Sequence, residues 1–228
     1  MAFKDEHSPS IPAKTLLSAS ILAGVLVSSS LTAGYPEWLI LLFKYEKSGG
    51  VNARHLLFLS CGLLYFVRFA IGMFKFLKRH ISWFESGLVS FLFFMLFYLF
   101  GISAGRHPEP LGGIEMVGVC LYLVGSIINT MADYQRYAWK RKIENKGRLY
   151  TLGLFQHAMH INYFGDSLVY IGLALITREW VCLYVALGII VNFIVLQIPM
   201  LDRHLKNRYG DAFDEYAKRT KKFIPFVY

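Results

Sequence analysis

Two pairs of polar residues with the same spacing are the part of this sequence best suited to bind a polar ligand. Asn129 and Asp133 close one apolar stretch, and Asn162 and Asp166 open the next. Residues four apart share one face of a helix, so each pair would present an amide beside a carboxylate. Such groups can hold sugar hydroxyls and a carboxamide. For Asn129 and Asp133 alone, a polar cap where a helix leaves a membrane is an equally good interpretation.

The segment between the two pairs is basic and aromatic. Its cations attract phosphate groups, and Arg in particular offers a planar fork of donors. Together with the amides and carboxylates, it predicts a site for a ligand that carries hydroxyls, an amide and phosphates. A pyridine dinucleotide fits this description, as do a phospholipid headgroup and, apart from the phosphates, S-adenosylmethionine. The cations are Arg136, Lys140, Arg141, Lys142, Lys146 and Arg148.

The C-terminal segment adds a further aromatic group. Tyr209, Phe213 and Tyr216 are spaced by four and three, which predicts one face of one helix, and Pro225 would end that helix. Tyr209 could donate a hydrogen bond into a cavity. The competing interpretation is an amphipathic helix that lies on a membrane surface.

The composition places these groups in a membrane protein. Of 228 residues, 55% are hydrophobic and only 17% are charged, which is too apolar for an ordinary soluble domain. A helix needs about 20 apolar residues to cross a bilayer, where lipid offers the backbone no hydrogen-bond partners. We therefore expect an all-α, polytopic helix bundle with six or seven transmembrane helices. Uncharged stretches cover residues 15–36, 86–105, 116–132 and 180–201; residues 55–77 and 149–177 are less uniform, and 38–43 form a short apolar run.

The net charge of +9 is concentrated in the loop before Asn162 and in the C-terminal tail. The positive-inside rule predicts an integral, multi-pass membrane protein with both segments on the cytoplasmic side. We divide the chain into a loose tail (1–14), N-terminal transmembrane helices with the substrate pocket (15–105) and a C-terminal region that carries the polar pairs (106–228). Contacts with membrane lipids are expected, and so is a monomer. The sequence contains no separable basic module, so we do not expect the protein to bind nucleic acid.

Other kinds of site are not predicted. His157 and His160 stand three apart, but only Asp166 lies near them at a metal-ligand spacing, so we expect no metal. The three cysteines all fall in apolar stretches, which argues against a disulfide framework. Neither the Rossmann nor the P-loop glycine motif is present in the sequence.

From residue 117 to the end, four blocks together resemble the C-terminal domain of the steroid 5-alpha-reductases and their enoyl- and sterol-reductase relatives. The blocks are "GVCLYLVGSIINTMADY", "GRLYTLGLF", "NYFGD" and "RYGDAFDEYAKRTKKFIPFVY". The resemblance implies a seven-helix membrane reductase that buries NADPH among its C-terminal helices. Lys140 stands where the family is expected to have Arg, which keeps the charge but loses the planar fork. The cofactor contacts that the resemblance implies are Asn129, Asp133, Lys140, Arg148, Asn162, Asp166 and Tyr209.

The N-terminal half resembles the family less closely. There "LLYFVRFAIGMF" is similar to a Tyr-Phe-x-Arg helix, which implies Tyr65 as the catalytic tyrosine and Arg68 as a supporting charge. Without the resemblance, Tyr65 would be one more interfacial aromatic among 14 tyrosines. The family's catalytic glutamate would be Glu37, with Glu46 and Glu85 as alternatives.

The reaction implied is the reduction of a C=C bond conjugated to a carbonyl in a lipid-like substrate of steroid, sterol or enoyl type. Hydride from NADPH would add to the β-carbon, and negative charge would build on the carbonyl oxygen. The Tyr65 hydroxyl, and a Glu37 kept protonated by burial, would stabilise that charge.

Two other functions compete with this interpretation. The first is an S-adenosylmethionine-dependent membrane methyltransferase that resembles the isoprenylcysteine carboxyl methyltransferases. Those enzymes carry Arg-His-Pro before their aromatic-Gly block, whereas this chain has His160, Ile161 and Asn162, which favours the reductase. The second is a non-enzymatic membrane protein that binds lipid or a partner through its basic loops. It would require the repeated Asn-x-x-x-Asp spacing to be accidental.

Overall fold

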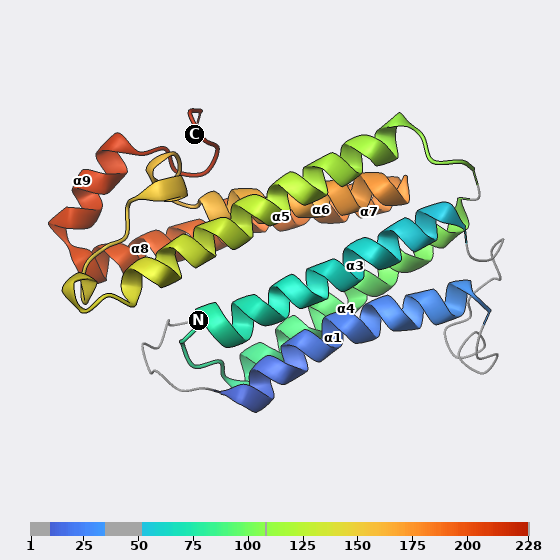
Figure 1. Ribbon diagram of the computed structural model, residues 1–228, viewed down its shortest axis with the longest axis horizontal. Coiled ribbons are helices and arrows are strands. Elements are labelled where there is room, and N and C mark those ends of the chain that lie inside the picture. The colour runs from blue at the N-terminus through green and yellow to red at the C-terminus, as the bar shows by residue number, and fades with distance from the viewer. Residues whose placement is uncertain (1–9, 35–51, 108, 228) are drawn as a thin grey trace. The chain divides into compact units, whose positions relative to one another are not determined.

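The computed structural model describes residues 10–34, 52–107 and 109–227 (Figure 1). Glu37, Glu46 and the apolar run at 38–43 lie outside the described residues. Within the described ranges the secondary structure is helical, apart from isolated bridge positions such as the pair Ala158 and Lys221. The helices are α1 (Ile11–Thr32), α3 (Ala53–Ile71), η1 (Gly72–Phe76), α4 (Trp83–Arg106), α5 (Gly113–Lys140), η2 (Ile143–Asn145), η3 (Gly153–Gln156), α6 (Ile161–Thr177), α7 (Trp180–Asn192), η4 (Phe193–Gln197), α8 (Ile198–Tyr209) and α9 (Asp211–Arg219).

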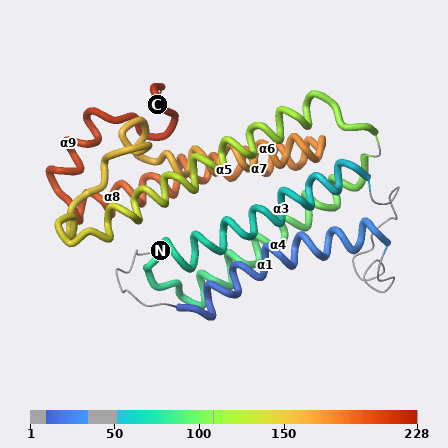
Figure 2. The backbone as a smooth tube through the Cα atoms, viewed as in Figure 1, coloured from blue at the N-terminus to red at the C-terminus, as the bar shows by residue number. Residues whose placement is uncertain are grey.

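Five helical segments in the described part of the chain are long and apolar enough to cross a membrane. They are Ile11–Thr32, Ala53–Phe76, Trp83–Arg106, Gly113–Lys140 and Trp180–Tyr209. The last one joins α7, η4 and α8 into one helix, which the backbone trace of Figure 2 follows. The apolar helix α6 is shorter, with 17 residues. The predicted all-α membrane bundle is thus confirmed, with five helices of spanning length and the shorter α6 among the described residues.

The chain divides into two compact units. The N-terminal unit comprises Ala2–Tyr122 and Ile171–Tyr184, and the C-terminal unit comprises Leu123–Tyr170 and Val185–Tyr228. Helices α5, α6 and α7 contribute to both units. The two Asn-x-x-x-Asp pairs, the basic loop and the tail all belong to the C-terminal unit, whereas Tyr65 belongs to the N-terminal unit.

In the N-terminal unit, α1, α3 and α4 lie side by side (Figure 1). Helix α1 begins at Ile11, inside the segment that the sequence suggested as a loose tail, because Pro12 suits the first turn of a helix. Lys14 is buried there, and its ammonium group donates to the backbone oxygen of Leu77 at 2.6 Å. Asn52 caps α3 by accepting a hydrogen bond from the His55 N–H at 2.8 Å.

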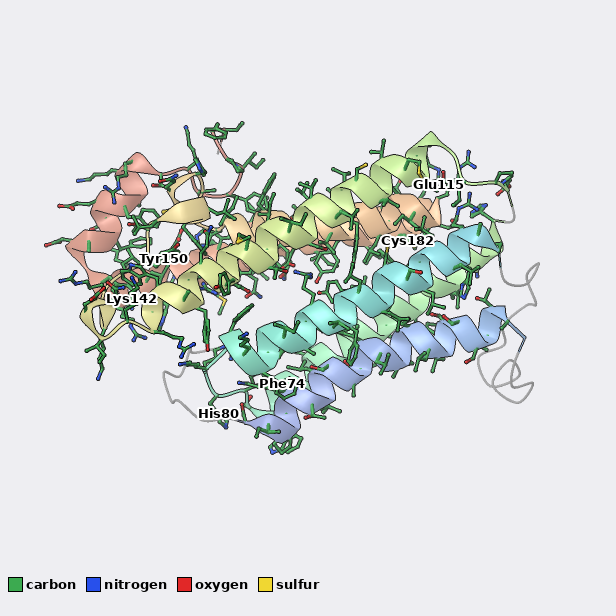
Figure 3. The ribbon with its side chains drawn as sticks, viewed as in Figure 1. Phe74, His80, Glu115, Lys142, Tyr150 and Cys182 are labelled. Atoms are coloured by element: carbon green, nitrogen blue, oxygen red, sulfur yellow. The ribbon has the colours of Figure 1, made fainter. Side chains whose placement is uncertain are left out.

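A buried ion pair fastens the first turn of α5 to α3. The Arg54 side chain is fully buried, and its guanidinium lies 2.8 Å from Glu115, which is 1% exposed. Figure 3 labels Glu115 near the start of α5. His107 reaches Glu179 at 3.1 Å, just before α7. All four residues belong to the N-terminal unit, so this cluster ties α3, α5 and the α6–α7 connection together within it.

Glycines bring α5 and α6 into close contact. In the N-terminal unit, a Cβ at Gly172 would lie 2.5 Å from the backbone oxygen of Gly118. In the C-terminal unit, a Cβ at Gly165 would lie 2.8 Å from the backbone N of Asn129. Close backbone approach through small residues is the usual way for helices to associate in lipid.

The C-terminal helices differ from the single helix predicted around Tyr209. Helix α8 ends at Tyr209, and α9 begins at Asp211 after Gly210, which has φ +53°. A positive φ favours glycine and breaks the helix. Helix α9 then ends at Arg219, well before Pro225.

Candidate functional site

The asparagines of the two Asn-x-x-x-Asp pairs meet where α5 contacts α6. The Nδ2 amide of Asn129 donates a hydrogen bond to the backbone oxygen of Asn162 at 3.1 Å. Asn129 is only 9% exposed, and Asn162 is half-buried at the second position of α6. The contact is possible because Gly165 leaves room for the α5 backbone at this level. Two residues that are 33 positions apart in the chain are therefore neighbours, as a shared site requires.

Each aspartate lies one turn C-terminal to its asparagine and is partly buried; because α5 and α6 run antiparallel, the two aspartates lie on opposite sides of the Asn129–Asn162 contact. Asp133 forms an ion pair with Arg136 on the same helix, with 2.7 Å between Oδ1 and the guanidinium. Asp166 follows Asn162 on α6 by the same four residues. Each aspartate therefore remains close to its asparagine, as expected for one helix face.

The two cations singled out in the sequence lie at the surface. Lys140 is the last residue of α5, and Arg148 follows the short helix η2; both side chains are exposed. Asn145 in η2 donates through Nδ2 to the Trp139 backbone oxygen at 2.9 Å, which closes the end of α5. The cations thus lie on a short, capped connection between α5 and α6.

The aromatic residues of the basic loop form a small core of their own. The Tyr150 ring lies 5.3 Å from Trp139 and 5.5 Å from Phe155 between ring centroids. Tyr150 lies in the loop beside α5 (Figure 3), and its burial raises the pKa of the phenol. Gly153, with φ +59°, lets the turn approach Gln135, whose Oε1 accepts from the Leu154 N–H at 3.0 Å. These aromatics shape the loop and are largely occupied with one another.

The tail is fastened onto this loop. The Tyr216 hydroxyl donates to the Phe155 backbone oxygen at 2.5 Å, and burial raises the pKa of Tyr216 well above its ordinary value. Tyr209 is half-buried and packs on a cluster formed by Met159, Phe213 and Tyr216. Tyr209 thus joins the predicted aromatic face through tertiary contact, although a helix break separates it from the other two residues.

One buried group of the C-terminal unit was not predicted. His160, 1% exposed, has its Nε2 2.8 Å from Asp202 on α8, and the other carboxylate oxygen of Asp202 lies 3.1 Å from Lys222. The backbone N–H of His160 also donates to the Lys222 oxygen at 3.0 Å. Asp202 comes directly after a long apolar stretch, and that position was the available signal in the sequence.

The proposed catalytic tyrosine, Tyr65, lies on α3 in the N-terminal unit and is 2% exposed. Its ring lies 4.9 Å from Phe97 and 6.1 Å from Phe69 between centroids, and the Arg68 guanidinium lies 4.8 Å above it. Tyr65 is thus a tightly held core residue with a cation on its face, rather than an interfacial aromatic.

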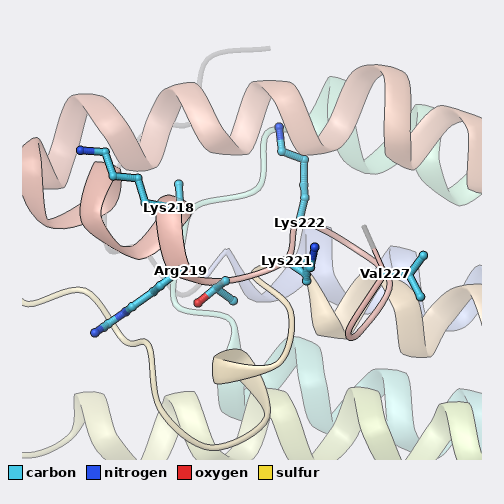
Figure 4. A pocket seen from close by; sticks show the side chains of 7 residues that line it. Lys218, Arg219, Lys221, Lys222 and Val227 are labelled. Atoms are coloured by element: carbon cyan, nitrogen blue, oxygen red, sulfur yellow. The ribbon is translucent and has the colours of Figure 1, made fainter.

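A pocket of about 320 Å³ lies between the end of α9 and the last residues of the chain. Of the cations that line it, Lys218, Arg219 and Lys222 point in different directions (Figure 4). The pocket therefore does not focus their charges on one point. Its lining residues are Ala217, Lys218, Arg219, Thr220, Lys221, Lys222 and Val227.

The five helices of spanning length among the described residues identify the chain as an integral, multi-pass membrane protein. Comparison with known proteins then identifies the family of this membrane protein. Residues 67–220 match the family described as "Protein of unknown function (DUF1295)", so the chain belongs to this family. The match includes both Asn-x-x-x-Asp pairs and Tyr209.

The relatives include steroid and sterol enzymes. The chain is 29% identical over 114 residues to 3-oxo-5-alpha-steroid 4-dehydrogenase 1 of Rattus norvegicus, covering 49% of this chain and 41% of the relative. It is 28% identical over 133 residues to Delta(14)-sterol reductase ERG24 of Saccharomyces cerevisiae, covering 53% and 30%. A "Probable O-methyltransferase ustE" of Ustilaginoidea virens is 29% identical over 108 residues, covering 47% and 34%.

The chain thus spans less than half the length of each of these relatives. The resemblance to the steroid 5-alpha-reductases that the sequence blocks suggested is confirmed by these similarities.

Proposed function

We propose that this protein is a membrane-embedded, NADPH-dependent reductase of a C=C bond conjugated to a carbonyl in a lipid-like substrate. The observation that carries the proposal is the hydrogen bond from the Asn129 amide to the Asn162 backbone, because it brings together the asparagines of two Asn-x-x-x-Asp pairs from different helices. The names of the steroid and sterol relatives support this class of substrate.

The side chains of the C-terminal unit fit a pyridine dinucleotide. Asn129 and Asn162 offer amide groups for ribose hydroxyls and a carboxamide, and the exposed Arg148 and Lys140 suit phosphates. Asp133 on α5, Asp166 on α6 and Tyr209 at the end of α8 add further hydrogen-bonding groups in the C-terminal unit. A buried ring nitrogen of His160 has no hydrogen-bond partner in the described structure, as expected beside a polar ligand. When bound, the nicotinamide supplies the hydride.

In the proposed reaction, Tyr65 donates a hydrogen bond to the substrate carbonyl oxygen as negative charge develops there. Because the Tyr65 ring is held by Phe97 and by the Arg68 guanidinium, its hydroxyl would be positioned before the substrate binds. One such donor in a site without water is worth about 3 kcal/mol of transition-state stabilisation. Glu37, outside the described residues, is the proposed second acid. The bilayer would exclude water from the reaction.

The test is ligand-induced stabilisation of the purified protein in detergent or nanodiscs. A ligand at 100 times its Kd raises the free energy of unfolding by about 2.7 kcal/mol. We expect NADPH to stabilise the protein and S-adenosylmethionine to leave it unchanged. Asn162→Ala and Arg148→Ala should weaken NADPH binding, whereas Tyr65→Phe should retain binding and abolish turnover of an enone substrate. Stabilisation by neither ligand would reject an enzyme of either kind.

A methyltransferase is the second candidate, and the similarity to the probable O-methyltransferase of Ustilaginoidea virens favours it. The amides and carboxylates would then hold the amino-acid and ribose parts of S-adenosylmethionine, and the exposed cations would have no phosphate to bind. The same titration decides between the two functions, because each predicts stabilisation by a different ligand.

We further propose that the basic loop and the C-terminus face the cytosol and that the enzyme works as a monomer. The exposed cations of residues 140–148 support this orientation. Attachment of a membrane-impermeant thiol reagent to a cysteine introduced at Ile143, which is 91% exposed, would report the side on which the loop lies. Labelling from the outer side of intact cells would contradict the orientation.

A further inference from the structure

Two polar atoms of His160, the backbone N and Nε2, have hydrogen-bond partners, whereas the second ring nitrogen has none in the described part of the chain. Its backbone N–H donates to Lys222, and its Nε2 bonds to Asp202, so the ring cannot turn freely. The Tyr163 ring stacks on the face of the His160 imidazole, with 6.0 Å between the ring centroids and 18° between the ring planes. The remaining nitrogen, Nδ1, is buried and has no hydrogen-bond partner in the described part of the chain.

The partners of Nε2 determine whether Nδ1 donates or accepts a hydrogen bond. Asp202 carries no proton to give and already accepts from Lys222, so the proton of the Asp202–His160 hydrogen bond belongs to Nε2. Because Lys222 balances the charge of Asp202, the pair does not require a charged imidazole. A neutral ring with its proton on Nε2 presents Nδ1 as an acceptor. A buried acceptor without a donor is unfavourable, and a donor from a ligand would remove that cost.

The position of His160 indicates which ligand this would be. It directly precedes α6 and lies two residues before Asn162, whose backbone contacts Asn129. All these groups belong to the C-terminal unit. We infer that His160 Nδ1 accepts a hydrogen bond from a hydroxyl or carboxamide N–H of the bound dinucleotide, while Asp202 and Lys222 hold the ring in place. This inference rests on the proposed NADPH-dependent function.

Two substitutions of His160 separate ligand binding at Nδ1 from the hydrogen bond of Nε2 that holds the ring. The amide of Gln reaches the position of Nε2, so His160→Gln can keep the bond to Asp202 while removing the acceptor at Nδ1. The amide of Asn reaches the position of Nδ1, so His160→Asn can keep an acceptor there while losing the bond to Asp202. The matched control is His157→Gln, because His157 is half-exposed and its ring lies 5.4 Å from the exposed Phe226.

The experiment measures Kd for NADPH and Tm for the full-length protein and the three variants in nanodiscs. We expect His160→Gln to bind NADPH about tenfold more weakly with an unchanged Tm, the value of one hydrogen bond. His160→Asn should lose Tm but keep more of the affinity, and His157→Gln should change neither quantity. Wild-type affinity and Tm in His160→Gln would overturn the role of His160 and leave the reductase proposal standing.

Two further outcomes are also decisive. If His160→Gln lowers Tm, the NADPH affinity of His160→Asn decides. Retained NADPH affinity in His160→Asn supports an acceptor at the position of Nδ1. A loss of NADPH affinity as large as in His160→Gln overturns the inference. If the wild-type protein does not bind NADPH at all, the proposed function falls and the inference falls with it, a result distinct from failure of His160 alone.

Discussion

Replacing Gly165 with alanine tests whether the close contact of α5 and α6 holds the two asparagines together. An ideal Cβ at Gly165 would lie 2.8 Å from the Asn129 backbone N and 2.9 Å from the Gly125 oxygen. Both neighbours are backbone atoms, so no side chain can move aside and the two helices must separate. Overpacking of this kind costs about 1–3 kcal/mol, against which alanine gains about 1 kcal/mol of helix propensity.

The matched control is Gly188→Ala on α7, because a Cβ there meets no atom within 4 Å. This variant should gain the helix propensity without the clash, so the two alanine variants should differ by about 2 kcal/mol. For a chain of this size that corresponds to a difference in Tm of about 5 °C. NADPH affinity should fall in Gly165→Ala alone, because the Asn129–Asn162 hydrogen bond is stretched. Equal Tm and equal affinity in the two variants would refute the reasoning.

Three further substitutions test other contacts, each by thermal unfolding in nanodiscs. Glu115→Gln should destabilise the protein by about 3 kcal/mol, because the fully buried Arg54 loses its buried carboxylate partner and keeps only the exposed Glu109 at 3.7 Å; an unchanged Tm would contradict a buried pair. Gly210→Ala should cost about 1–3 kcal/mol, since alanine is strained at φ +53° and ψ −128°, whereas Gly188→Ala controls for propensity. Tyr216 has a raised pKa, so its stabilising effect is complete below the ordinary tyrosine pKa of about 10 and is lost as pH rises above it. Stability should therefore fall at alkaline pH in the wild type and less steeply in Tyr216→Phe; parallel pH curves would count against this hydrogen-bonded, buried phenol.

The helices were predictable because lipid imposes strict limits on a chain. Residues 86–105 carry no charge and were expected to span; helix α4 runs from Trp83 to Arg106, beginning beside the Ser82 cap and ending at the first charge. Helix α5 extends eight residues beyond its uncharged stretch, to Lys140, because the polar Asp133 and Gln135 remain helical at the end of the bundle. Hydrophobicity therefore located the apolar helices of the described residues but not their polar ends.

The tertiary contacts of the site were much less predictable. His160 and Asp202 are 42 positions apart, and neither residue carries a local pattern that indicates the other. The contact of Gly165 with Asn129 likewise depends on how two helices pack, which spacing within one helix cannot reveal. The break at Gly210 did have a local signal, since glycine commonly ends helices, but the regular spacing of Tyr209, Phe213 and Tyr216 pointed the other way.

In the loop between the two polar pairs, the aromatic residues have a structural role, and the proposed ligand-binding role falls to other residue types. Trp139, Tyr150 and Phe155 contact one another, and the Phe155 backbone oxygen accepts the Tyr216 hydroxyl, so these rings stabilise the loop. The Arg148 side chain is exposed. Aromatic side chains are therefore poor candidates for stacking on a ligand here, and the cations and amides are better ones. A Tyr150→Phe variant should accordingly bind NADPH as the wild type does, whereas Arg148→Ala should not; the opposite result would mean that the ring, rather than the charge, contacts the ligand.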